Sequence, residues 1–197
     1  MSKYTSFAEL LRHERPGRDF RIVHLERSAS PVFIVAPHGG EIEAGTSEIA
    51  GLIAGTEHSL FCFEGLKCGG DSRDLHITSH LFDHPECIAL AARRGVIVSV
   101  HGCKGDARVF VGGLDRDLGE HLARRLSHER FEVVTGGHEY PGRHPSNICN
   151  RGSRSMGAQL EITHDLRAEV YRGRIAAAVR AAIADFLASD GPGGRAA

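Results

Sequence analysis

A short apolar run that ends in a histidine and two glycines constrains this chain more than any other segment. Residues 32–36 have the length and apolar character of a buried strand, and Pro37-His38-Gly39-Gly40-Glu41 follows. A strand that carries His38 to its carboxyl end, and a glycine turn that brings Glu41 back, would place an imidazole beside a carboxylate. A catalytic zinc uses ligands of these two kinds. Glu43, on the same loop, is an alternative ligand, and a plain turn with a solvated Glu41 is the alternative to any metal site.

Strand-like and helix-like segments alternate along the rest of the chain. Strands are predicted at 20–25, 32–36, 60–63, 96–100, 109–111, 131–134 and 159–163, and helices at 5–13, 46–55, 84–95, 114–126 and 165–187. This alternation predicts one α/β domain over residues 1–190 with a largely parallel or mixed sheet. The glycine-rich end, residues 191–197, is expected to be a flexible tail.

Two further residues could complete a metal site. His101 directly follows the apolar run 96–100, and sites in such sheets form beyond the carboxyl ends of central strands, so His101 is our third ligand. Glu161 lies between Leu160 and Ile162, so its side chain points to the opposite face of a predicted strand. A carboxylate on a core strand is costly unless it is paired or functional, which makes Glu161 a candidate general base. The alternatives are a hydrogen-bonded histidine at a strand end and a glutamate that faces solvent.

A basic loop precedes the last predicted strand. Residues 141–159 contain arginines and a histidine but no acidic residue, which favours binding of a carboxylate or phosphate, with a solvated basic loop as the alternative. Arg151, with its neighbour Asn150, is our first candidate for binding an anionic substrate. Arg154 and Arg108 are further candidates.

The composition excludes several other classes of protein. The chain has 197 residues, a net charge of −1 and no apolar stretch of the ~20 residues that a membrane helix needs. It therefore predicts no nucleic-acid partner and no membrane partner. Five cysteines without paired spacing and the absence of a signal sequence favour a reduced, cytoplasmic protein, which we expect to be a monomer.

These motifs, in this order, resemble the poly-γ-glutamate hydrolase family, bacterial and phage proteins with a zinc carboxypeptidase-like domain that are also labelled phage-related replication proteins. The matching segments run from about Val32 to Thr163: 36–43, 45–50, 63–65, 75–79, 99–102, 111–113, 147–151 and 159–162. The resemblance implies a three-layer α/β/α sandwich, one zinc ion per chain and hydrolysis of amide bonds to glutamate, most characteristically the γ-linkage of poly-γ-glutamate. It implies His38, Glu41 and His101 as zinc ligands and Glu161 as the base. One departure concerns the substrate: Asn150-Arg151 follows His101, whereas the corresponding pair in larger carboxypeptidases precedes the last zinc histidine.

Two other functions remain as alternatives. A small-molecule deacylase would act on an N-acyl amino acid such as formylglutamate, in a closed pocket rather than an open groove. A non-catalytic, phage-derived metal-binding protein would keep the ligands without turnover, although the presence of both the ligand set and Glu161 weighs against it. His76, Cys103 and Cys149 lie in or beside the matching motifs, and the sequence assigns them no role.

Overall fold

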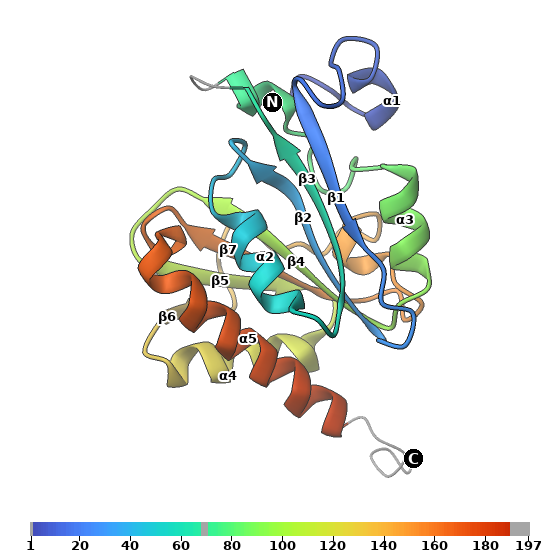
Figure 1. Cartoon of the computed structure of the whole chain (residues 1–197). Coiled ribbons are helices and arrows are strands. Elements are labelled where there is room, and N and C mark those ends of the chain that lie inside the picture. Colours follow the sequence, from blue (N-terminus) through green and yellow to red (C-terminus); the bar gives the residue numbers. More distant parts are fainter. Residues whose placement is uncertain (1, 68–70, 190–197) are drawn as a thin grey trace.

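A computed structural model describes residues 2–67 and 71–189 of the chain. Within them, seven strands form one sheet in the order β1-β3-β2-β4-β7-β5-β6 (Figure 1). The strands are β1 Phe20–Leu25, β2 Val32–Gly40, β3 Ser59–Gly65, β4 Val96–Cys103, β5 Arg108–Gly113, β6 Glu132–Val134 and β7 Ala158–Thr163. Only β1–β3 and β5–β7 among these pairs are antiparallel, which confirms the predicted mixed, largely parallel sheet.

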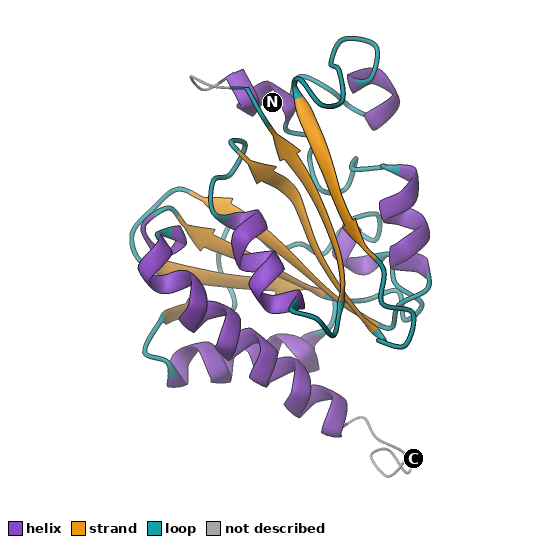
Figure 2. Ribbon diagram, viewed as in Figure 1, coloured by secondary structure: helices purple, strands orange, loops and turns teal. Residues whose placement is uncertain are grey.

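Helices cover both faces of the sheet, as Figures 1 and 2 show. They are α1 Phe7–Leu10, α2 Thr46–Ala54, α3 Pro85–Ala92, α4 Arg116–His128 and α5 Glu169–Ser189, with short 3-10 helices η1 Asp71–Leu75, η2 Ile148–Asn150 and η3 Asp165–Arg167. α2, α4 and α5 lie on one face, and α1, α3 and η2 contribute to the core on the other. The three-layer α/β/α arrangement is thereby confirmed. No helix in the described ranges is both long and apolar enough to span a bilayer.

Alternating side chains of the central strands fill two separate cores. On β4, Val98 and Val100 pack under α2, α4 and α5, together with Leu160 of β7. Ile97 of β4 packs on the opposite face, against the core that contains α1 and α3. β2 is buried along nearly its whole length, as expected for a strand at the centre of a parallel sheet.

The second face of β4 and β7 changes from apolar to polar toward the carboxyl ends of the strands. Ser99 and His101 follow Ile97 on β4, and Gln159 and Glu161 lie beside them on β7, all of them buried. Burial of polar side chains is costly without partners or function. The sheet therefore places its polar interior at the edge where a parallel sheet forms sites.

Several elements differ in length from the sequence prediction. β2 runs through Gly40 and β4 through Cys103, whereas the apolar runs end at residues 36 and 100. The last helix begins at Glu169 rather than 165, because η3 comes first. The predicted tail, residues 191–197, lies outside the described residues.

Candidate metal centre

Two glycines at the end of β2 allow the chain to pass close to β3. The β2–β3 register shifts between Ala36 and Gly39. A Cβ on Gly39 would lie 1.9 Å from Ser47 Oγ, and one on Gly40 would lie 2.4 Å from Gly65 O, with Gly40 at φ +61°. Only glycine adopts this conformation and this approach without strain. The chain therefore reverses after Gly40, one residue later than it would with a turn at Gly39.

This late reversal brings Glu43 against His38. Glu43 N donates to His38 O at 2.9 Å, and the hydroxyl of Thr46 at the start of α2 donates to Glu43 O at 2.8 Å. Glu43 Oε1 then lies 3.2 Å from His38 Nδ1. Its other oxygen, Oε2, accepts from Gly102 N at 2.7 Å and lies 3.8 Å from His101 Nδ1. One carboxylate is therefore held between the ends of β2 and β4.

The Nδ1 atoms of the two histidines face each other and the carboxylate of Glu43. His38 Nε2 donates to Ile77 O at 2.7 Å, so Nδ1 faces Glu43 and His101. Burial lowers the pKa of His38, but the charge of Glu43 and the hydrogen bonds to Glu43 and Ile77 outweigh it and raise that pKa. A metal ion bound at Nδ1 would take the place of the proton there. His101 Nδ1 lies 3.1 Å from His38 Nδ1. Burial and the nearby His38 lower the pKa of His101 to about 3, so that it is a neutral ligand near neutral pH. Two imidazoles and a carboxylate form a common catalytic zinc set, and a carbonyl such as that of Ile77 typically orients a zinc-binding histidine.

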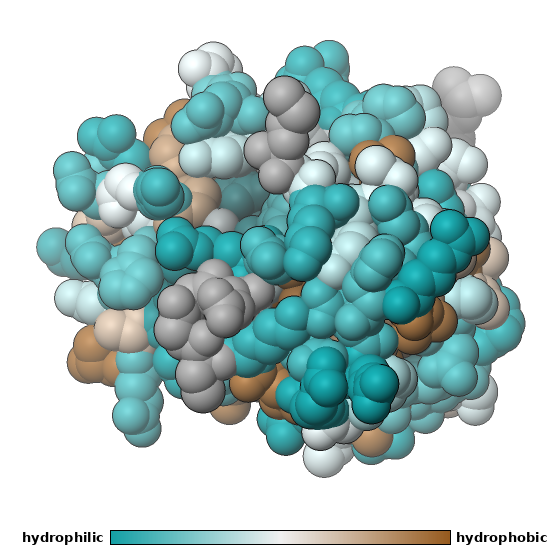
Figure 3. Space-filling view, turned by 90° about the horizontal axis from the view of Figure 1, so that it is seen from above, coloured by the Kyte–Doolittle hydropathy of each residue, from teal (hydrophilic) through white to brown (hydrophobic). Residues whose placement is uncertain are grey.

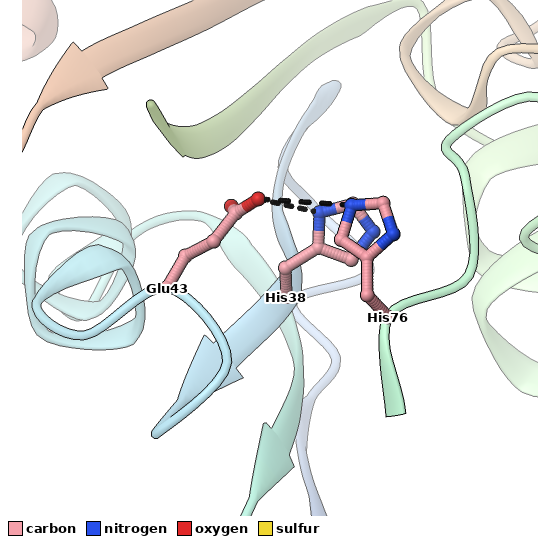
Figure 4. Close-up of side chains that lie close together, drawn as sticks. All are labelled: His38, Glu43 and His76. Atoms are coloured by element: carbon pink, nitrogen blue, oxygen red, sulfur yellow. Dashed lines mark ion pairs between the residues drawn. The ribbon is translucent and has the colours of Figure 1, made fainter. Parts of the chain in front are cut away.

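His76 is a fourth member of this cluster, and Figure 4 shows its ring beside that of His38 with the carboxylate of Glu43 pointing toward both. The two ring centroids are 3.9 Å apart. The ligand atoms of His38, Glu43 and His76 lie within 4.8 Å of one another. The charge of His38 and burial lower the pKa of His76 to about 3, so it is also neutral. Ser2 Oγ lies 2.9 Å from His76 Nδ1, which leaves Nε2 directed toward Glu43.

Glu41, the carboxylate that the sequence suggested first, lies elsewhere on the loop. It is exposed, and its backbone N–H donates to Gly65 O at 3.0 Å. The structure thus brings together His38, His101 and Glu43, the alternative ligand of the same loop. The difference follows from β2, which continues through Gly40 and leaves Glu41 on the outer side of the turn.

Glu161 lies next to the cluster on the neighbouring strand. It is paired in register with His101 across β4 and β7, and it is 8% exposed. Gln159 Nε2 donates to Glu161 Oε1 at 3.0 Å, and Gln159 Oε1 accepts from Asn147 Nδ2 at 2.8 Å. Burial, with a contribution from Glu43, raises the pKa of Glu161 well above its usual range. A raised pKa makes this carboxylate a stronger base than an exposed glutamate.

These side chains face an open cavity of about 1020 Å³. His38, Glu43, His76, His101 and Glu161 all line it, with Arg73, Lys104, Arg143 and Arg167 as the cationic residues and Glu41 and Glu139 as further acids. The end of the molecule seen in Figure 3 is mainly hydrophilic. The cavity is larger than one amino acid requires.

The four residues predicted to bind substrate do not line this cavity. Arg108 Nε donates to Glu132, and Arg154 Nη1 donates to Asp115. Within the basic loop, Arg151 Nε donates to Ser146 O, and Asn150 Nδ2 donates to Gly142 O and His144 O; these bonds hold the loop together.

Sequence reasoning missed Arg167. It lies in η3 directly after β7, and it lines the cavity. The sequence could have suggested it, because Arg167 lies a few residues beyond the carboxyl end of the strand that carries Glu161, where sites form in such sheets.

Comparison with known proteins identifies the family of this chain. A family described as poly-gamma-glutamate hydrolase matches residues 4–184. The chain belongs to this family. Among its relatives in Bacillus subtilis, YndL is 37% identical over 171 residues, which are 85% of this chain and 66% of YndL. The SPbeta prophage-derived YoqZ is 36% identical over 173 residues, 86% of this chain and 61% of YoqZ. The chain thus spans less than two thirds of the length of these two relatives.

Solved structures share the fold. A bacteriophage poly-gamma-glutamate hydrolase superposes with a TM-score of 0.89 at 27% identity, covering 96% of this chain and 100% of the phage chain. A zinc-free form of YndL superposes with a TM-score of 0.84 at 32% identity, covering 97% and 100%. A carboxypeptidase A candidate from Shewanella denitrificans has a TM-score of 0.54 at 13% identity, covering 84% of this chain and 60% of that one, and it shares the fold alone.

Proposed function

We propose that this chain is a zinc-dependent amidohydrolase that cleaves the γ-glutamyl bonds of poly-γ-glutamate. The observation that carries the proposal is the convergence of His38, His101 and Glu43 beside the buried Glu161, at one edge of the sheet and in one open cavity. Membership of the family supports the glutamyl polymer as substrate. The zinc-free form of YndL supports zinc as the metal.

His38, Glu43 and His101 would hold the single zinc ion, and hydrogen bonds orient the first two. Ile77 O fixes the ring of His38, and Gly102 N fixes one oxygen of Glu43. When bound, zinc supplies a Lewis acid that polarises the scissile carbonyl and acidifies the attacking water. The ring of His76 lies tilted against that of His38, beside the proposed ligands.

Glu161 is the proton carrier of the proposed reaction. Gln159 occupies Oε1, so Oε2 is the atom that takes a proton from the attacking water. As the water oxygen bonds to the carbonyl carbon and the C–N bond breaks, the same carboxyl gives its proton to the leaving nitrogen. The products are a carboxylate and a free amine. The raised pKa of Glu161 strengthens it as a proton acceptor.

The size and openness of the cavity favour a polymer over a small acyl amino acid. A cavity of about 1020 Å³ accepts several linked residues, and cationic side chains such as Arg73, Lys104 and Arg143 on its lining suit an anionic chain. A small-molecule deacylase would instead enclose one substrate molecule. Dependence of the rate on chain length separates these functions.

The test compares wild-type protein with Glu161→Gln and, as a matched control, Glu120→Gln on the exposed surface of α4. Zinc-loaded protein is incubated with poly-γ-glutamate, and newly formed amines are counted. Loss of a general base costs about 100- to 10,000-fold in rate. We expect this loss in Glu161→Gln with unchanged zinc content, and wild-type rates in Glu120→Gln.

Three results would contradict the proposal. Wild-type turnover in Glu161→Gln would remove the assigned base. Equal rates on poly-γ-glutamate and on N-acyl glutamate would favour the deacylase. Full zinc occupancy without cleavage of any glutamyl amide would favour the non-catalytic metal-binding protein.

A further inference from the structure

Arg167 is a buried cation whose hydrogen-bonding capacity is largely unused. Its side chain is 8% exposed. The guanidinium donates from Nη1 to Ile162 O at 3.1 Å, while the buried Nε has no partner among the described residues. Those residues also give it no ion pair. A buried guanidinium with one carbonyl partner is costly, so that its retention at the wall of the cavity points to an anionic ligand.

Two glycines make room for this side chain. A Cβ on Gly102 would lie 1.5 Å from Arg167 Nη1, so the guanidinium rests directly on the backbone of β4. A Cβ on Gly45, at φ +94°, would lie 2.8 Å from Arg167 Cβ and from its carbonyl oxygen. A side chain at either glycine would therefore collide with Arg167 in its present position.

The guanidinium lies beside the groups that the proposed reaction uses. Gly102, on which it rests, follows His101 and donates its N–H to Glu43. Ile162, which accepts its hydrogen bond, follows Glu161. Burial lowers the pKa of Arg167, while the negative charges of Glu43 and Glu161 act in the opposite direction. A guanidinium nevertheless stays protonated at physiological pH, so that a fixed positive charge lies at the reacting centre.

A γ-linked glutamate chain carries an anion at the matching place. The α-carboxylate of each unit is bonded to the carbon next to that unit's amide nitrogen. We propose that Arg167 binds the α-carboxylate of the unit whose nitrogen is released, and so selects amides whose released unit carries a free α-carboxylate. A planar guanidinium fork fits a carboxylate with two parallel hydrogen bonds. This inference rests on the proposed function and assigns its substrate selectivity to one residue.

The test uses a γ-linked glutamate oligomer in which one internal α-carboxylate is a carboxamide. Zinc-loaded wild-type protein is incubated with this oligomer, and the cleaved bonds are located by mass spectrometry. We expect the bond to the nitrogen of the amidated unit to be cut at least about 100-fold more slowly than the other bonds, because the buried cation is left unpaired. Equal cleavage of all bonds overturns the inference and leaves the proposed function standing. Failure to cut the unmodified oligomer overturns both.

Variants add a second readout. Arg167→Gln should cut unmodified bonds about 100-fold more slowly and should no longer distinguish the amidated unit, while Arg167→Lys should keep part of the preference. Arg125→Gln is the matched control, since Arg125 pairs with Asp185 between α4 and α5. It should retain both rate and preference. A preference that persists in Arg167→Gln overturns the assignment, and if that variant does not fold, the wild-type cleavage map decides alone.

Discussion

Replacing either glutamate of the β2–α2 loop by glutamine tests which one binds the metal. In Glu43→Gln, Gly102 N–H must still find an acceptor, so the amide oxygen turns toward it and the amide nitrogen takes the place of Oε1. That position lies 3.2 Å from His38 Nδ1 in the native protein. An amide NH₂ is a donor and cannot bind zinc. Glu41→Gln alters only an exposed side chain.

The expected loss is large. Removing a partner that merely orients a zinc ligand costs about 10- to 100-fold in metal affinity, so loss of the ligand itself should cost at least about 100-fold. That factor corresponds to about 2.7 kcal/mol of binding free energy. Glu41→Gln should bind zinc as the wild type does.

Zinc affinity is measured by competition with a chromophoric chelator, and circular dichroism confirms that each variant is folded. Wild-type affinity in Glu43→Gln would refute the assignment of Glu43. A loss confined to Glu41→Gln would restore Glu41, the ligand that the sequence suggested first.

Three further substitutions test the fold around the site. Gly40→Ala should lower the free energy of unfolding in urea by about 2 kcal/mol or more, because a Cβ at φ +61° would meet Gly65 O at 2.4 Å; unchanged stability would contradict the close approach. Glu14→Gln should cost about 1 kcal/mol near neutral pH. Burial raises the pKa of Glu14, but hydrogen bonds from Lys67 and Tyr4 and the charges of Lys67 and Lys3 together outweigh it, so the net pKa lies below 4.5. The difference from wild type should therefore shrink as the pH falls below 4.5, and a difference that grows there would contradict the pairing. Arg151→Gln should lower the melting temperature and leave the KM for the polymer unchanged, whereas a raised KM would return Arg151 to the substrate site.

Local sequence was enough to place the residues on β4 and β7. The β-branched run 96–100 predicts one strand, and the alternation of polar and apolar residues around Glu161 predicts the other. His101 directly follows the first run, and Glu161 lies between Leu160 and Ile162, so the strand period places each side chain on a face of the sheet. Both end up on the polar face of neighbouring strands. The alternation of strands and helices likewise predicted the layered fold.

The position of Glu43, the proposed carboxylate ligand, depends on contacts that are not local in sequence. β2 continues past its apolar run because Gly39 and Gly40 fit against β3, residues that come some 25 positions later. Sequence spacing alone could not show where the turn begins, and so it favoured Glu41 over Glu43. Sequence alone has the same limit for the arginines, because a basic loop predicts positive charge but does not show where each side chain points. Arg151 turns back to its own loop, while Arg167 reaches the cavity.

The most direct test of the central claim is reversible loss of hydrolysis with the metal. Purified protein is analysed for zinc, assayed for amine release from poly-γ-glutamate, treated with a chelator, assayed again, and finally reloaded with zinc. The arrangement of His38, Glu43 and His101 predicts one zinc ion per chain, activity that falls in proportion to the zinc removed, and recovery when zinc is restored. Full activity in protein stripped of metal would contradict the proposed centre.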